Sequence, residues 1–192
     1  MQETEITVQV LGDLPTIFAK LQSLGFTQIR EYGLHDWYFT HLKVNPKIDY
    51  AELMKNSFLV RHVTGTEEKV QLHYKDKTMD AAGNVTSEEK ITVQLSNLPD
   101  ALKIFRQAGL ACWCELQQTL FVFRKGDTEF AVQSVAGLGN FIEYEADASM
   151  AAMTPAQKMA QMYARLRALG LSLGTDLSCK KVYLKFLQDQ TR

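Results

Sequence analysis

The sequence predicts an α+β fold in which two repeated halves supply eight strands to a closed or nearly closed β-barrel, with helices packed outside. Two observations predict it. Polar and apolar residues alternate along several short segments, as they do in half-buried strands. Residues 6–10 (ITVQV) also return as residues 91–95 (ITVQL), and each copy is followed by Leu-Pro and a helical pattern. Two copies of such a unit can close their sheets against each other beneath the helices.

The first half begins with a strand over residues 5–10, where the two faces alternate cleanly. Apolar residues at helical spacing over 17–24 predict a helix, and Gly25 ends it. A second strand is expected around residues 37–39. Residues 45–55 form a polar excursion with a short helix.

Two more strands complete this half. Residues 57–63 and 70–75 are expected to pair around a turn at residues 64–66, and residues 80–84 form a loop. Asp36 lies next to Trp37 and Tyr38, in the strand expected around residues 37–39, and is expected at the end of that strand.

The second half repeats this order of one strand, one helix and three strands. Residues 58–61 correspond to 130–133, and residues 72–75 correspond to 142–145. Thr154-Pro155 then has the pattern of a helix start, and a closing helix follows near the end. The sequence therefore predicts a single domain over 1–192, with an internal repeat of 5–77 and 90–147 and C-terminal helices within 154–190.

Composition excludes several classes of function. The 192 residues carry 21 Lys plus Arg against 22 Asp plus Glu, a formal net charge of -1, so no overall field favours nucleic acid or an anionic membrane. The start of the chain lacks the apolar core of a signal peptide, and a cytoplasmic location is expected. The three cysteines, Cys112, Cys114 and Cys179, fit ordinary thiols better than a disulfide framework or a metal site.

The segment GLGNFIEYE, residues 137–145, organises the rest of the chain. A Gly-x-Gly turn leads into a strand in which Glu143 and Glu145 point to the same face. Their Cα atoms are expected about 6.5 to 7 Å apart, so both carboxylates can reach one cation. A solvated surface pair is the alternative interpretation.

Polar residues of the other predicted strands also share one face. Charges inside a sheet must be paired, solvated or held for a ligand, because an isolated buried charge is costly. A polar channel therefore explains the pattern. Its expected lining is Glu3, Glu5, Arg61, His73, Lys75, Gln133, Glu143 and Glu145.

These features together resemble the CYTH superfamily, and within it the class IV adenylyl cyclase group. The resemblance covers nearly the whole chain and is most specific in the segment ending at Glu145. It implies an eight-stranded antiparallel tunnel that holds a triphosphate with basic side chains and a divalent metal with glutamates. Related members of the superfamily are inorganic and thiamine triphosphatases.

The resemblance also implies residue roles. Mg²⁺ or Mn²⁺ is expected on Glu3, Glu5, Glu143 and Glu145, since these hard cations prefer carboxylate oxygen. Arg61 and Lys75 are expected to bind phosphate, helped by His73, although a strand histidine is often only a hydrogen-bonded neighbour of its sheet. The expected ligand is a nucleotide or another inorganic or organic triphosphate, with no nucleic acid and no membrane as partner. A homodimer is left open.

Several expected charges are missing. The family pattern has cations where this chain has Thr7, Leu59, Gln117 and Thr119, and an aspartate where it has Gln133. Each lost charge-assisted contact removes roughly 1.5 to 3 kcal/mol of binding free energy. A tunnel-fold protein that binds a ligand or a protein without catalysis is therefore the alternative to a cyclase or triphosphatase. A third interpretation pairs the remaining charges with one another in a structural network.

Overall fold

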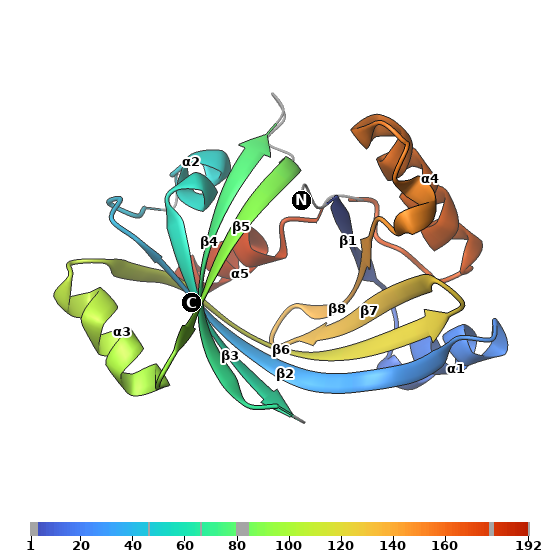
Figure 1. The fold of residues 1–192 in the computed structure, drawn as a ribbon, viewed down its shortest axis with the longest axis horizontal. Coiled ribbons are helices and arrows are strands. Elements are labelled where there is room, and N and C mark those ends of the chain that lie inside the picture. The colour runs from blue at the N-terminus through green and yellow to red at the C-terminus, as the bar shows by residue number, and fades with distance from the viewer. Residues whose placement is uncertain (1–3, 46, 66, 80–84, 177–178, 192) are drawn as a thin grey trace. The chain divides into compact units, whose positions relative to one another are not determined.

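The computed structural model describes residues 4–45, 47–65, 67–79, 85–176 and 179–191. Eight strands form one antiparallel hydrogen-bonded sheet in the order β1-β8-β7-β6-β2-β3-β4-β5 (Figure 1). The strands are β1 (Glu5–Val10), β2 (Thr27–Thr40), β3 (Ser57–Gly65), β4 (Lys69–Met79), β5 (Val85–Leu95), β6 (Ala111–Lys125), β7 (Thr128–Val135) and β8 (Gly139–Glu145). The predicted α+β fold with eight antiparallel strands is confirmed.

Among the residues that the structure describes, five α-helices accompany the sheet. They are α1 (Leu14–Ser23), α2 (Tyr50–Lys55), α3 (Leu98–Gln107), α4 (Pro155–Ala168) and α5 (Lys181–Gln190). Within the described part of the chain, every helix is too short or too polar to cross a membrane. The predicted loop at residues 80–84 lies outside the described residues.

Each half of the chain contributes the same order of elements. The first half gives β1, α1, β2, β3 and β4, with the short α2 inserted before β3, and the second gives β5, α3, β6, β7 and β8. The first strand of each half pairs with the last strand of the other, β1 with β8 and β5 with β4 (Figure 1). These two strand pairs therefore occupy equivalent places in the two halves.

Matching caps begin the equivalent helices α1 and α3. The Asp13 side chain accepts a hydrogen bond from the Thr16 amide, and the Asn97 side chain accepts one from the Asp100 amide. Each helix has proline in its first turn, where the missing N–H costs nothing. Gly25 and Gly109 follow the helices with φ of 85° and 82°, a conformation that glycine adopts without strain.

The described chain clusters into two compact units, and β2 and β6 each have residues in both. Unit 1 takes in residues 32–117 and 181–191, and unit 2 takes in the described residues of 4–31 and 118–180. Each unit therefore draws strands from both halves of the chain.

Unit 2 buries one face of its strands beneath two helices. Ile6 and Val8 of β1 and Ile142 and Tyr144 of β8 join a core with residues of α1 and α4. Phe18 of α1 packs edge-on against Phe121 of β6. Because side chains alternate along a strand, the neighbouring odd-numbered residues of β1 and β8 point to the opposite face.

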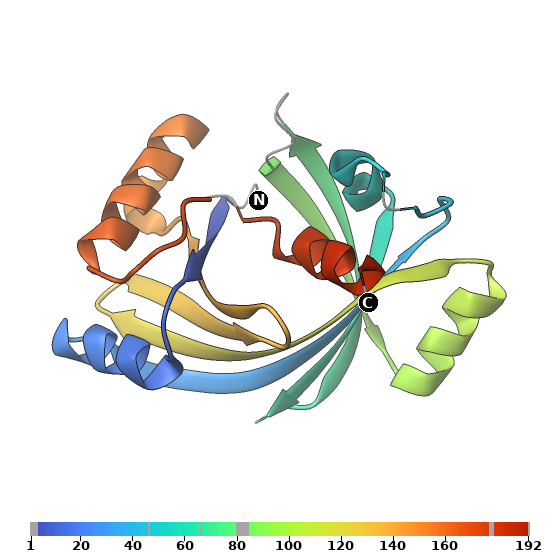
Figure 2. The same cartoon turned by 180° about the vertical axis from the view of Figure 1, so that it is seen from behind.

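Unit 1 is built in the same way around α3. Trp37, Phe39 and Val60 from β2 and β3 pack with Ala101 of α3 in a buried cluster. The C-terminal helix α5, drawn in red in Figure 2, also belongs to this unit. Its Phe186 ring packs edge-on against Trp113 of β6.

Candidate functional site

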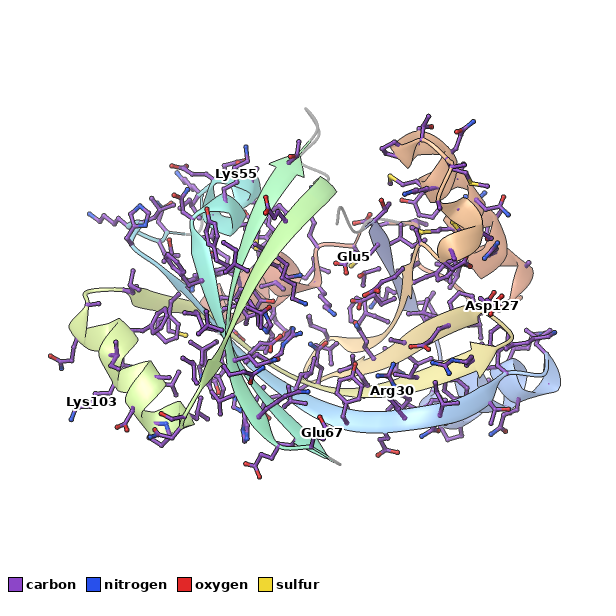
Figure 3. The ribbon with its side chains drawn as sticks, viewed as in Figure 1. Glu5, Arg30, Lys55, Glu67, Lys103 and Asp127 are labelled. Atoms are coloured by element: carbon purple, nitrogen blue, oxygen red, sulfur yellow. The ribbon has the colours of Figure 1, made fainter. Side chains whose placement is uncertain are left out.

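Three glutamates gather on the open face of β1 and β8 in unit 2. In the antiparallel register Glu5 stands opposite Glu145, and Glu143 lies two residues further along β8, opposite Thr7. One carboxylate oxygen from each glutamate lies within 4.8 Å of the others. Figure 3 labels Glu5 on its strand. Glu3, also predicted as a metal ligand, lies outside the described residues.

Neutral donors hold the central glutamate of this cluster. The Gln133 side-chain amide on β7 donates to Glu143 Oε2 at 2.8 Å, and the Thr7 hydroxyl donates to the same oxygen at 3.5 Å. These bonds orient the carboxylate without cancelling its charge.

The donor set fits a hard divalent cation. Mg²⁺ holds oxygens at about 2.1 Å in an octahedron, so two oxygens on one ion are about 3.0 Å apart when adjacent and about 4.2 Å apart when opposite. Small side-chain rotations would bring the three glutamate oxygens, now within 4.8 Å of one another, into that range. Glu5 and Glu143 are half-buried while Glu145 is exposed, which leaves room for water or phosphate ligands. The metal-binding role of Glu5, Glu143 and Glu145 stays a prediction.

An anchor on the other face of β8 fixes the end of this strand. The Tyr144 hydroxyl donates to Asp147 Oδ2 at 2.9 Å, and the Arg165 guanidinium of α4 donates to both groups and to Ser149. Burial, together with the bond to Asp147, raises the pKa of Tyr144 to about 12. This network positions the backbone that carries Glu143 and Glu145.

The register of β6 corrects one sequence assignment. Thr119 has the same parity as Phe121, which packs on α1, so it points away from the glutamates. Leu120 stands opposite Gln133 and therefore lies on the glutamate face, as does Gln118. Both are uncharged, so the expected cations are still missing, but at 118 and 120.

Gln117 was also assigned to a missing-cation position. It belongs to unit 1, where its amide lies 3.3 Å from the ring nitrogen Nε2 of His35 on β2. The same His35 nitrogen lies 2.6 Å from Glu115. Gln117 thus belongs to a polar cluster with His35, which it contacts directly, and Glu115, which contacts His35.

Arg61 in unit 1 forms a double hydrogen bond with a buried acid. Its Nε and Nη2 donate to Asp36 Oδ1 and Oδ2, both at 2.7 Å. Asp36 is fully buried, with 0% exposure. The prediction that Asp36 ends a strand was wrong, because it lies inside β2, opposite Arg61 of β3.

His73 lies on the same face of unit 1, one strand away from Arg61. It is only 3% exposed, and its Nδ1 is 2.9 Å from the Thr92 hydroxyl of β5. Its other ring nitrogen, Nε2, is buried and has no hydrogen-bond partner among the described residues. Burial, followed by the positive charges of Arg61, Lys90 and Lys75, lowers the pKa of His73 to about 4. The imidazole is therefore neutral near pH 7.

Lys75 continues this face along β4, two residues after His73. Directly opposite stands Lys90 of β5, which sequence reasoning did not single out. The repeat held the necessary signal, because Lys90 precedes residues 91–95 as Glu5 precedes residues 6–10. The phosphate-binding role of Arg61, His73 and Lys75 stays a prediction.

Comparison with known structures identifies proteins with a similar fold. A protein of Pyrococcus horikoshii OT3, PH1819, superposes with a TM-score of 0.70 at 20% identity, covering 98% of this chain and 99% of the other. A proposed adenylate cyclase of Vibrio parahaemolyticus gives 0.60 at 14% identity, covering 96% and 98%. A proposed adenylyl cyclase of Hippeastrum, described with a dominant triphosphatase activity, gives 0.57 at 13%, covering 98% and 96%.

No protein-family model matches the sequence, and no curated protein matches it significantly. Sequence identities this low show a shared fold, but they do not show that this chain has the activities for which those proteins are named. The chain has the fold of these cyclase-like and triphosphatase structures, as its resemblance to the CYTH superfamily predicted.

Proposed function

We propose that this protein binds a divalent cation, Mg²⁺ or Mn²⁺, together with a triphosphate-containing small molecule, and acts on it as a triphosphatase or adenylyl cyclase. The observation that carries the proposal is the convergence of Glu5, Glu143 and Glu145 within 4.8 Å on one open strand face. The shared fold of a Hippeastrum protein with a described triphosphatase activity supports it.

In this proposal each group has a defined part. A bound cation would neutralise phosphate charge and polarise the phosphorus–oxygen bond. Gln133 and Thr7 keep Glu143 oriented as a metal ligand. Lys75 and Arg61 contribute positive charge to phosphate, and Asp36 holds the Arg61 guanidinium in a fixed orientation.

Manganese titration of the purified protein tests the metal site. We expect Glu143→Gln to lower Mn²⁺ affinity at least tenfold, since it removes one of three anionic ligands. Glu67→Gln is the matched control, because this exposed glutamate belongs to the β3–β4 region of unit 1 (Figure 3). Equal Mn²⁺ affinity in both variants would contradict the metal assignment.

The second candidate is a non-catalytic binding protein with the same fold. It is favoured by Gln118, Leu120 and Gln133, uncharged residues on the face that carries Glu143. Assays of ATP, inorganic triphosphate and thiamine triphosphate with either metal separate the two candidates. Turnover that Glu143→Gln abolishes supports the enzyme, whereas metal binding without turnover supports the second candidate.

A further inference from the structure

Two histidines stand directly opposite each other on β2 and β3 of unit 1. His35 pairs with His62 in the antiparallel register. Side chains at such positions lie on the same face of the sheet, with Cβ atoms about 4.5 to 5.5 Å apart. Trp37, two residues after His35, packs in the α3 cluster, so both histidines belong to the face that α3 covers. This is the opposite face from the one that carries Arg61 and His73.

A carboxylate contacts each of these histidines at its Nε2 atom. His35 Nε2 lies 2.6 Å from Glu115 Oε1 of β6. His62 Nε2 lies 2.9 Å from Oε1 of Glu68, which comes just before β4 and next to Glu67, labelled in Figure 3. Both carboxylates are exposed, whereas both imidazoles are half-buried. Ion pairs at a surface contribute little to stability, so stability alone does not account for two of them on opposite residues.

Stacking and a second polar contact orient His35. Its ring stacks on the Trp37 indole, with ring centroids 3.7 Å apart and an interplanar angle of 27°. The Gln117 side-chain amide lies 3.3 Å from the same Nε2 atom that contacts Glu115. Nε2 therefore has a defined position among polar groups, and a ring held in this way loses little conformational freedom when it binds a ligand.

Two imidazoles and two carboxylates are a donor set for a borderline transition-metal ion. Zn²⁺ binds histidine nitrogen and carboxylate oxygen at about 2.1 Å in a tetrahedron, so neighbouring ligand atoms on one ion are about 3.3 Å apart. Directly opposite residues of an antiparallel pair are close enough for both imidazoles to reach the same ion. Two neutral imidazoles and two carboxylates also balance the charge of a divalent ion.

Binding requires a local rearrangement of side chains. Within the described part of the chain, the three glutamates of unit 2 are the group of ligand atoms that already lie within 4.8 Å of one another. The atoms of unit 1 form two separate histidine–glutamate pairs instead. The Glu68 side chain is 75% exposed and lies between strands, so it can rotate with His62 toward His35. Bonds to the metal would then replace the two histidine–glutamate contacts.

We infer that His35 and His62, together with Glu115 and Glu68, form a second cation site, which takes a borderline divalent transition-metal ion such as Zn²⁺. Its chemistry differs from that of the glutamate cluster, because imidazole nitrogen suits Zn²⁺ whereas a set of carboxylates suits Mg²⁺ or Mn²⁺. The ligands come from β2, β3, β6 and the β3–β4 connection, so a bound ion joins three strands of unit 1. The inference depends neither on triphosphate binding nor on turnover.

Calorimetric titration of the full chain with Zn²⁺ in millimolar Mg²⁺ tests the inference. A Glu143→Gln background weakens the glutamate cluster and leaves the histidines as they are. On it we expect His35→Gln and His62→Gln each to lower Zn²⁺ affinity at least tenfold, since either change leaves a single imidazole. His41→Gln is the matched control, because this exposed histidine follows β2 about 20 Å along the chain from His35. It should change affinity less than about twofold.

Thermal unfolding of the same samples separates metal binding from a structural role. Without Zn²⁺, glutamine in place of either histidine should leave the unfolding midpoint close to that of the background. With Zn²⁺, the midpoint should rise in the background and in His41→Gln, and rise less in His35→Gln and His62→Gln. Equal Zn²⁺ affinity in all three histidine variants, or no Zn²⁺ binding at millimolar concentration, would overturn the inference. A loss in only one of His35→Gln and His62→Gln would also overturn it, because one imidazole would then bind alone.

Discussion

The strand pair β1–β8 of unit 2 and the strand pair β4–β5 of unit 1 have the same register and opposite charge. The first carries Glu5, Glu143 and Glu145, whereas the second carries Lys75, Lys90 and a neutral His73. In both, the opposite face is apolar, and at β1–β8 it is buried in the core beneath α1 and α4. At β4–β5 part of it packs in the α3 cluster, while Ile91 and Val93 of β5 are exposed. Packing therefore fixes where the polar side chains stand, and the residue type at each position decides which ion the face attracts.

The largest difference between the two faces is the buried acid of unit 1. Asp36→Ala removes the buried carboxylate that accepts two hydrogen bonds from Arg61, and we expect the free energy of unfolding to fall by about 4 kcal/mol. Denaturant unfolding measures this. Asp127→Ala, at an exposed turn of unit 2, is the control and should change little (Figure 3). A loss of stability as small as that of the control would show that the ion pair between Asp36 and Arg61 does not stabilise unit 1.

A second difference concerns pH. The folded pKa of His73, about 4, lies below its ordinary value of 6.5, so the unfolded chain binds a proton more readily between these values. Stability is then fully present above pH 6.5 and falls as the pH drops toward 4, by about 3 kcal/mol in total. His73→Gln, which keeps a polar side chain near Thr92, should remove this component. Parallel pH profiles of the two proteins would contradict the assignment.

Gln133→Glu would add a negative charge to the face that carries the three glutamates. It replaces an amide donor with a fourth carboxylate next to Glu143, so repulsion should lower the stability of the metal-free protein. Mn²⁺ affinity should rise about tenfold, because more anionic ligands strengthen binding. Titration and thermal unfolding of the same samples check both signs. A variant with lower metal affinity would show that Gln133 serves the site as a donor.

The smallest effects come from the two threonines. Thr92→Val leaves a buried ring nitrogen of His73 without its partner and should cost about 1 kcal/mol. Thr7→Val removes a bond of 3.5 Å to Glu143 and should cost less than about 0.5 kcal/mol. Valine matches threonine in shape, so denaturant unfolding reports the hydrogen bonds. A larger loss of unfolding free energy for Thr7→Val than for Thr92→Val would contradict this prediction.

Much of this arrangement could be predicted because it depends on local pattern. The alternation in β8 predicted that Glu143 and Glu145 share a face, and the repeat pointed to the equivalence of β1 and β5. Asp36 was misplaced because strand ends are poorly marked in a stretch as aromatic as residues 37–39, and its burial depends on Arg61 of another strand. Such a pairing leaves no periodic signal in the sequence.

Strand register was the other source of error. Shifting β6 by one residue moves every side chain to the opposite face, so the assignment of Thr119 to the ligand face failed while its neighbours Gln118 and Leu120 lie there. Lys90 was overlooked because the family pattern drew attention to residues it already names. The internal repeat could have found it.

The most direct test of the central claim is a thermal unfolding series with Mn²⁺ alone and with tripolyphosphate alone. Each ligand at about one hundred times its dissociation constant should stabilise the natural protein by roughly 2.7 kcal/mol. Glu143→Gln should lose only the Mn²⁺ shift, and Lys75→Gln should lose most of the tripolyphosphate shift and keep that of Mn²⁺. The claim that the two faces bind ions of opposite charge would be contradicted if neither ligand shifted the unfolding midpoint. It would also be contradicted if the glutamate variant lost only the tripolyphosphate shift and the lysine variant lost only the Mn²⁺ shift.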